Sequence, residues 1–299
     1  MSAPVKAPVK AILKPHPRDI GGFTVARVLP AMDARLIGPF IFFDYMDQRA
    51  HPSLPGAGMD VLPHPHIGIA TVTYLFEGAL MHRDSVGSVQ KIVPGDVNWM
   101  TAGRGIVHSE RTPAAERASG QLLRGIQSWV ALPASHAEIA PSFEHHAAAS
   151  LPRIVLDGVT LQLLAGSALG HTSPVTTYSP MLYAAAHFAA ASRFTFDAEQ
   201  EERGVYLVEG ELALDGTPLA PLHMAVLTPG ERVTLTSHAG ATVMLIGGQK
   251  LAGEHLIEWN FVASTRARLE RARDAWAAQT MGQVPGETGW IAQPPRKPR

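Results

Sequence analysis

The chain has 299 residues, of which 46% are hydrophobic and 17% are charged, and its formal net charge is −1. This near-neutral balance gives no electrostatic reason to expect direct nucleic-acid binding or attachment to a membrane surface. The sequence contains no cysteine, which excludes disulfides, thiolate metal ligands and cysteine nucleophiles, so any metal must be held by His, Asp, Glu or water.

The first residues, MSAPVKAPVKAILKP, contain lysine and proline but lack the apolar core of a signal peptide. No run of about 18 apolar residues follows, so the sequence predicts no membrane-spanning helix. We therefore expect a cytoplasmic protein that does not associate with membranes.

Short runs rich in Val, Ile, Leu, Thr and aromatic residues recur along the chain, separated by Gly and Pro. They are TVTYLFEG (71–78), QKIVPGDVNWM (90–100), QSWVAL (127–132), VTLQLLAG (159–166), GVYLVEGELAL (204–214) and ATVMLIGG (241–248). Short strands at this spacing indicate an all-β sandwich or barrel. One clear helix is expected over 264–280, with Ser264 or Thr265 as N-cap and with Leu269 and Trp276 packing it against the β structure.

The two halves of the chain contain a repeat. YLFEG (74–78) resembles YLVEG (206–210), and we align the turn Pro94-Gly95-Asp96 after the first with Pro229-Gly230-Glu231 after the second. The repeat predicts two β-barrels related by duplication, over residues 1–140 and 141–299, with the helix in the second. We expect a loose link over 134–152, with the EHH at 144–146 exposed to solvent.

Two pairs of polar residues have the period of a β-strand. His64 and His66 are separated by Pro65, which favours an extended backbone at the residue before it, so both imidazoles project to one face. His108 and Glu110 repeat this spacing. If the two strands are neighbours and both pairs face inward, three imidazoles and one carboxylate converge.

This combination of side chains has a recognisable chemistry. Imidazole and carboxylate without thiolate suit Fe(II), Mn, Ni, Cu or Zn and resemble the open 2-His-1-carboxylate sites of oxygen-using iron enzymes. Four such ligands on an octahedral ion leave two positions for water, dioxygen or a chelating substrate, whereas a closed tetrahedral site would indicate structural zinc. The alternative is that the histidines are exposed or simply packed.

The second repeat offers no such ligands. Counted from the glutamate and proline that the repeats share, the four ligand positions fall on Phe196, Ala198, Val243 and Leu245. We therefore expect one metal per chain, in the N-terminal barrel.

Several nearby residues have simpler interpretations. HRDSVG (82–87) indicates a hairpin turn, with His82 or Arg83 lining the barrel mouth as the alternative. AGRG (102–105) lacks the features of a phosphate-binding loop, and we expect a tight turn that directs His108 inward. Trp129 is expected in the core.

Four motifs together resemble the pirin family, a branch of the cupin superfamily. They are GPFIFFDYMD (38–47), HPHIGIATVTYLFEGALMHRDSVG (64–87), PGDVNWMTAGRGIVHSE (94–110) and GIQSWVALP (125–133), and a weaker resemblance continues through VYLVEGEL and FVASTRARL. The resemblance implies a monomer of two cupin-type barrels, a bicupin. It also implies one mononuclear metal, usually iron, held by His64, His66, His108 and Glu110.

The resemblance implies two alternative functions. The first is an oxygen-dependent enzyme of the quercetin 2,3-dioxygenase type, which opens a flavonol or related enol with dioxygen. Fe(II) is then the expected metal, with Mn, Ni, Cu, Co or Zn as alternatives, and Glu110 is the candidate catalytic proton acceptor. The second is a non-enzymatic, iron-dependent redox sensor that binds a protein partner. It is favoured by Ile67 and Ala70, near which many relatives carry Arg and Glu. A third interpretation is a vestigial structural barrel.

Overall fold

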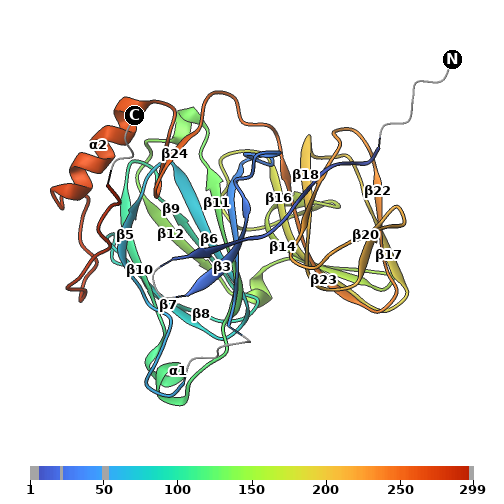
Figure 1. The fold of residues 1–299 in the computed structure, drawn as a ribbon, viewed down its shortest axis with the longest axis horizontal. Coiled ribbons are helices and arrows are strands. Elements are labelled where there is room, and N and C mark those ends of the chain that lie inside the picture. Colours follow the sequence, from blue (N-terminus) through green and yellow to red (C-terminus); the bar gives the residue numbers. More distant parts are fainter. Residues whose placement is uncertain (1–6, 21–22, 49–53, 296–299) are drawn as a thin grey trace. The chain divides into compact units, whose positions relative to one another are not determined.

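The computed structural model of the chain describes residues 7–20, 23–48 and 54–295 (Figure 1). The fold is all-β with a C-terminal helix, as expected. It divides into two compact units, each assembled from separate parts of the chain. Unit 1 comprises residues 1–18, 25–45 and 149–251, and unit 2 comprises residues 19–24, 46–148 and 252–299. That two cupin domains meet near residue 140 stays a prediction.

Unit 2 contains two groups of four antiparallel strands. The strands of the first group are β5 (Val61–His66), β10 (Ile106–Arg111), β7 (Leu80–Asp84) and β8 (Val89–Ile92), and they form a sheet in that order. Those of the second are β12 (Ser142–His146), β9 (Val97–Thr101), β6 (Ile69–Glu77) and β11 (Arg124–Ala131), adjacent in that order. β-Branched and aromatic residues in β6 favour this extended, buried structure.

The last part of the chain also belongs to unit 2. It contains β24 (Leu256–Glu258), β25 (Phe261–Ala263) and helix α2 (Arg266–Ala277). The side chain of Thr265 caps α2 by accepting from the backbone N–H of Arg268, as the sequence predicts, although the helix is shorter than 264–280. Leu269 and Trp276 are each 2% exposed and share an apolar cluster with Ile67 of the segment after β5. Figure 1 shows α2 lying beside β5.

Unit 1 has the same kind of architecture. Its strands are β1 (Val9–Leu13), β13 (Arg153–Leu156), β14 (Val159–Ala168), β15 (His171–Thr172), β16 (Met181–Phe188), β17 (Ser192–Phe196), β18 (Glu202–Gly210), β19 (Leu212–Leu214), β20 (Thr217–Leu219), β21 (Met224–Leu227), β22 (Val233–Ser237) and β23 (Ala241–Gly248). One sheet has the order β1-β21-β18-β23-β16-β14-β13, with β15 paired to β14, and the other has the order β17-β22-β19-β20. Buried side chains of both sheets form one apolar core.

The remaining elements are short or cross the division between the units. Residues of β2 (His16–Asp19), β3 (Thr24–Leu29) and β4 (Phe40–Asp47) fall in both units. Helix α1 spans Ala114–Ser119, and the 3-10 helices η1 and η2 span Ala134–His136 and Ala148–Ser150.

The segment 134–152 is therefore not the loose link that we expected. It includes β12, which pairs with β9 and leaves the EHH half-buried.

The repeat exists, but our alignment of its turns is wrong. Strands β6 and β18 carry the two similar sequences, and β22 lies between β17 and β19 as β10 lies between β5 and β7. In the second repeat the strand equivalent to β9 precedes Pro229 instead of following it. The turn equivalent to Pro94-Gly95 therefore begins at Pro221. Aligned from there without gaps, His108 falls on Leu235 and Glu110 on Ser237.

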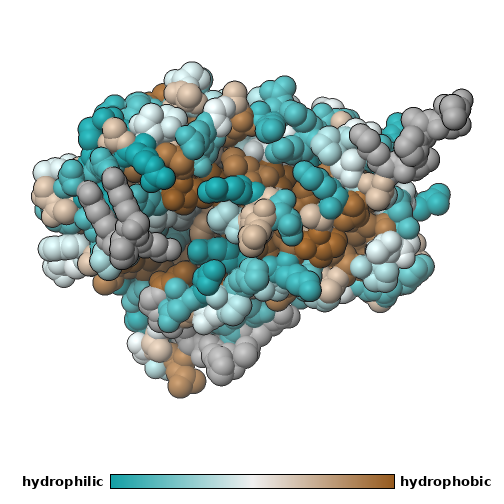
Figure 2. Space-filling model, turned by 45° about the horizontal axis from the view of Figure 1, so that its top comes forward, coloured by the Kyte–Doolittle hydropathy of each residue, from teal (hydrophilic) through white to brown (hydrophobic). Residues whose placement is uncertain are grey.

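The surface exposes both hydrophobic and hydrophilic side chains. On the face drawn in Figure 2, hydrophobic side chains are exposed in patches among hydrophilic ones. Such exposure is ordinary for a protein surface and assigns no function by itself. In the part of the chain that the structure describes, no helix has the length and apolar character needed to cross a membrane.

Candidate metal centre

Three imidazoles meet on two neighbouring strands of unit 2. Strands β5 and β10 are antiparallel, and His108 lies directly opposite His64 in their register. The ring centroids of His64 and His66 lie 4.3 and 5.1 Å from that of His108. One potential ligand atom from each ring lies within 4.8 Å of the other two, which is close enough to share an ion. The structure thus brings together the three histidines that the sequence singled out.

Two of the rings are oriented by backbone carbonyls. Nδ1 of His64 lies 2.9 Å from the carbonyl oxygen of Leu62, and Nδ1 of His66 lies 3.1 Å from that of Asn260. A carbonyl oxygen only accepts, so each Nδ1 carries the hydrogen of the neutral ring. The lone pair then sits on Nε2, where histidine binds metals when its other nitrogen donates to such a group.

The ring of His108 shows whether the site fits a metal. Nε2 of His108 is buried and has no hydrogen-bond partner among the described residues. Leaving a buried polar atom unpaired costs about 1–3 kcal/mol. An ion shared with His64 and His66 would satisfy this nitrogen, so the donor set fits a metal.

Burial also keeps the three rings uncharged. It lowers the pKa of His64 to about 4, and it holds the pKa values of His66 and His108 well below the usual range, with repulsion among the imidazoles adding to the effect. Metal binding requires neutral imidazole. The rings are therefore in the binding form at neutral pH, with no proton to displace.

Glu110 lies farther along the same face of β10. The register between β10 and β5 is irregular between His108 and Glu110, so Glu110 lies opposite Val61. Its Oε1 accepts from the hydroxyl of Thr73 at 3.1 Å, and burial raises the pKa of Glu110. Among the described residues, the group of ligand atoms within 4.8 Å of one another does not include this carboxylate.

Residues that sequence reasoning placed elsewhere line the histidine cluster. Trp129, expected in the core, is buried and meets His66 edge-on, with centroids 5.1 Å apart. His82 does lie in a hairpin between β7 and β8, but its buried ring also contacts His108, with their Nδ1 atoms 3.4 Å apart. The sequence signal was the two-residue spacing of Leu80, His82 and Asp84, which places all three on one face of a strand, the buried face of β7.

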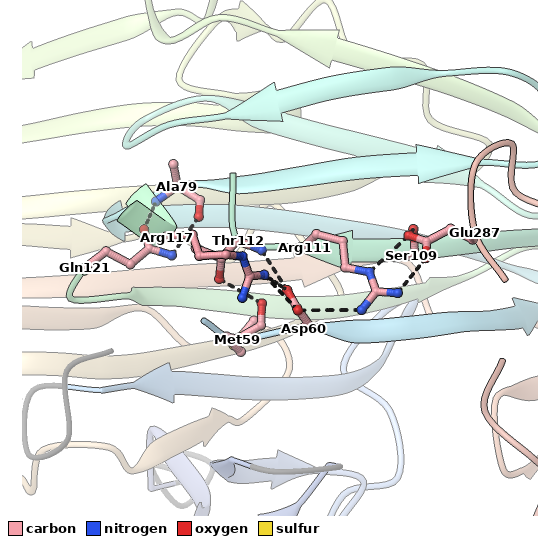
Figure 3. Close-up of polar contacts among 9 residues, drawn as sticks. All are labelled: Met59, Asp60, Ala79, Ser109, Arg111, Thr112, Arg117, Gln121 and Glu287. Carbon is pink, nitrogen blue, oxygen red and sulfur yellow. Dashed lines mark hydrogen bonds and ion pairs between the residues drawn. The ribbon is translucent and has the colours of Figure 1, made fainter. Parts of the chain in front are cut away.

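The opposite face of β10 is held by the C-terminal segment. Ser109 and Arg111 alternate with the inward-facing pair, and both donate to the carboxylate of Glu287 (Figure 3). Arg117 and Arg111 also converge on Asp60, at 2.6 and 3.6 Å. These contacts fix the strand that carries His108 and Glu110.

Apolar residues occupy the places of the three histidines in unit 1, and Ser237 takes the place of Glu110. Of the four positions we expected, only Phe196 is among these places, where it replaces His66. Val243 and Leu245 lie on β23, which pairs with β18 and β16 and so corresponds to β11. By cross-strand register, Phe194 opposite Leu235 replaces His64 opposite His108. The misaligned turn in the repeat accounts for Val243 and Leu245. The expected Phe196 and Ala198 are displaced because the connection between β17 and β18 is longer than the one between β5 and β6.

Family models match both halves of the chain. The pirin model matches residues 22–130, and the model of the pirin C-terminal cupin domain matches residues 183–282. A pirin-like protein of Caulobacter vibrioides is 46% identical over 88% of this chain and 91% of its own length.

Two further relatives have names that refer to an activity. A Pseudomonas aeruginosa protein, provisionally named quercetin 2,3-dioxygenase, is 40% identical over 86% of this chain and 79% of its own length. A crystal structure of quercetin 2,3-dioxygenase from Acinetobacter baumannii is 34% identical, with a TM-score of 0.88 over 96% of this chain and 95% of that one.

Proposed function

Because this chain belongs to the pirin family, we propose that it is a metal-dependent dioxygenase of the quercetin 2,3-dioxygenase type. The observation that carries the proposal is the meeting of three buried, neutral imidazoles, one of which has an unpaired Nε2. Relatives named for this activity supply the substrate class, a flavonol or a similar aromatic enol.

His64, His66 and His108 are the proposed metal ligands, and Glu110 is the proposed fourth. The bound ion would supply Lewis acidity and a redox centre for chemistry with dioxygen. Fe(II) remains the proposed metal, with Mn, Ni, Cu, Co and Zn as alternatives. A cytoplasmic, monomeric state also remains a prediction from sequence.

We assign Glu110 the role of proton acceptor. An enol becomes reactive toward oxygen when its hydroxyl loses a proton, and a carboxylate whose pKa is raised by burial accepts that proton more readily than an exposed one. The Thr73 hydroxyl, 3.1 Å from Oε1, holds the carboxylate in place. If Glu110 also binds the ion, it must loosen from it to take the proton.

Aromatic rings around the cluster favour the same substrate class. Trp129 lies against His66, and Phe143 stacks on His82 with centroids 4.3 Å apart. Such apolar walls limit the access of water and give a planar ring a surface on which to pack.

The test is to load the protein separately with Fe, Mn, Ni, Cu or Co and to follow quercetin and dissolved oxygen together. We expect one oxygen molecule consumed for each quercetin with at least one metal. The His108→Ala variant should show no such turnover, whereas His223→Ala, which removes a half-buried histidine of unit 1, should match the wild type. Full metal loading without quercetin loss would overturn the proposal and leave the redox-sensing regulator as the candidate.

A further inference from the structure

We propose that His82 and Asp84 form a positioning pair that fixes the tautomer of His108 and thereby keeps its Nε2 lone pair free for the ion. This inference rests on the metal site proposed above. It nevertheless makes a separate claim about hydrogen positions in the metal-free protein.

Three side chains form one hydrogen-bonded row on neighbouring strands. In the register of β10 and β7, His108 lies opposite Asp84 and Glu110 lies opposite His82. Nε2 of His82 lies 2.9 Å from Oδ2 of Asp84, and its Nδ1 lies 3.4 Å from Nδ1 of His108. All three side chains are buried, so solvent does not compete for these contacts.

The carboxylate of Asp84 acts as an acceptor in each of its hydrogen bonds. Its Oδ1 accepts from the backbone N–H groups of Val86 at 3.0 Å and Ser88 at 2.9 Å, in the turn after β7. Its Oδ2 faces His82. Because every contact of this carboxylate is with a donor, an ionised Asp84 satisfies all of them. Nε2 of His82 must then carry a hydrogen.

The hydrogen on His82 determines the one on His108. In the proposed arrangement His82 carries a single ring hydrogen, on Nε2, which leaves Nδ1 as an acceptor. The only hydrogen that can then occupy the contact between the two rings is one on Nδ1 of His108. His108 consequently has its lone pair on Nε2, the buried atom that has no partner among the described residues.

The stacking of Phe143 keeps the row in place. Its ring lies 4.3 Å from that of His82 at an interplanar angle of 15°. A partial rotation of the imidazole about χ2 would break this stacking, and a half-turn would break the bond to Asp84. His64 and His66 need no such arrangement, because each donates directly to a backbone carbonyl. The pair supplies for His108 what the carbonyls supply for the other two rings.

The Asp84→Asn variant tests this chain of hydrogens with almost no change in shape. The amide oxygen can keep the two turn N–H groups, which places the NH₂ group against Nε2 of His82. His82 must then carry its hydrogen on Nδ1 and donate to Nδ1 of His108, whose own hydrogen moves to Nε2 and blocks the ion. Loss of a group that orients a ligand typically lowers metal affinity about 10–100-fold.

Two measurements test the proposal. Long-range ¹H–¹⁵N spectra of histidine-labelled, metal-free protein report each tautomer directly, and competition with a chelator gives the affinity for Zn²⁺ or Ni²⁺. We expect the Nδ1–H form of His108 in the wild type, the Nε2–H form in Asp84→Asn, and an affinity lower by 10-fold or more. The matched control is Asp96→Asn, a buried turn carboxylate that accepts from Val93 and Ala148, which should change neither.

Each result bears on one claim. Wild-type His108 in the Nε2–H form would overturn the inference, and so would a folded Asp84→Asn variant with wild-type affinity. The spectrum of the wild type decides the matter even if the variant does not fold. A wild-type protein that shows the expected tautomers but binds no ion would instead overturn the proposed function.

Discussion

The Nδ1 of His66 lies 3.1 Å from the carbonyl oxygen of Asn260, a residue 194 positions away in the sequence. A side chain from β5 is thus oriented by the turn between β24 and β25. The N-terminal histidine pair depends for its geometry on the C-terminal part of the chain, which belongs to the same compact unit.

Removal of one imidazole should abolish metal binding. In His66→Ala, two histidines remain of the three that meet, and we expect metal content to fall from about one ion per chain to near zero. His223→Ala is the control, because Nδ1 of His223 also contacts a carbonyl oxygen, that of Pro221 at 2.9 Å. Metal analysis of purified protein gives the answer, and full occupancy in His66→Ala would contradict the ligand assignment.

Chelation should lower the melting temperature of the wild type. A ligand that binds only the folded state adds RT ln(1 + [L]/Kd) of stability, about 2.7 kcal/mol at a free concentration 100 times Kd. The His66→Ala variant should melt at the same temperature with and without chelator. An unchanged wild-type midpoint would favour the vestigial structural barrel.

Replacement of Glu110 should separate turnover from metal binding. In Glu110→Gln we expect kcat for quercetin to fall about 10²–10⁴-fold, the usual effect of losing a general base. Metal content should fall less than in His66→Ala, because the three imidazoles already meet without the carboxylate. The control, Thr73→Val, removes only the hydroxyl that contacts Oε1 and should lower kcat less than Glu110→Gln does. Wild-type kcat in Glu110→Gln would remove Glu110 from the mechanism.

The ion pair beneath β10 should give a pH-dependent stability. Hydrogen bonds from Arg111 and Ser109 hold the pKa of Glu287 below its usual range. A carboxylate whose pKa is depressed by folding stabilises the protein above its unfolded pKa, about 4.3, and loses that contribution as the pH falls through the folded value. The melting temperature of Glu287→Gln should therefore lie below that of the wild type at pH 7.

The difference between Glu287→Gln and the wild type should shrink toward zero as the pH falls below about 4. Glu138→Gln is the control. The Glu138 carboxylate pairs with Arg268 at 2.7 Å, but its side chain is 59% exposed, so its removal should change the melting temperature little at any pH. A constant difference for Glu287→Gln would contradict the role of its charge.

The anchor of helix α2 should carry a large share of the stability of unit 2. Trp276 is 2% exposed, and its indole N–H donates to the carbonyl of Ile291 at 3.0 Å. Trp276→Ala should lower the free energy of unfolding by about 3–5 kcal/mol in a urea titration. The control, Trp290→Ala, truncates a side chain that is 53% exposed and should change it by less than about 0.5 kcal/mol.

The two-residue period of a β-strand predicted the histidine cluster from sequence, because this period depends only on the local backbone. It placed His64 and His66 on one face of a strand and His108 on another strand, and the structure brings these rings together on neighbouring strands. The same rule put Glu110 on the face of β10 that carries His108, but it could not predict the irregular register that sets Glu110 opposite Val61 of β5. Such a bulge depends on the pairing of two strands and leaves no mark in the local pattern.

The sequence pattern could not predict contacts between distant parts of the chain. The ring of His82 and the carbonyl of Asn260 act on ligands 26 and 194 residues away. HRDSVG has the composition of a turn, and a turn follows Asp84, but His82 and Asp84 themselves lie in β7. The sequence offered a place for His82 at the barrel mouth only as the alternative. Ile67 likewise packs in an apolar cluster with Trp276, which lies far away in the sequence.

The discontinuous make-up of the two units limits how the protein can be dissected. Unit 2 needs residues 46–148 together with 252–299, and unit 1 needs 25–45 together with 149–251. A stop codon or a protease cut within 149–251 therefore leaves both units incomplete. Separate expression of the halves would yield fragments, whereas a shortened chain in which 149–251 is deleted and 148 is joined to 252 would keep the histidine cluster and its C-terminal support in one polypeptide.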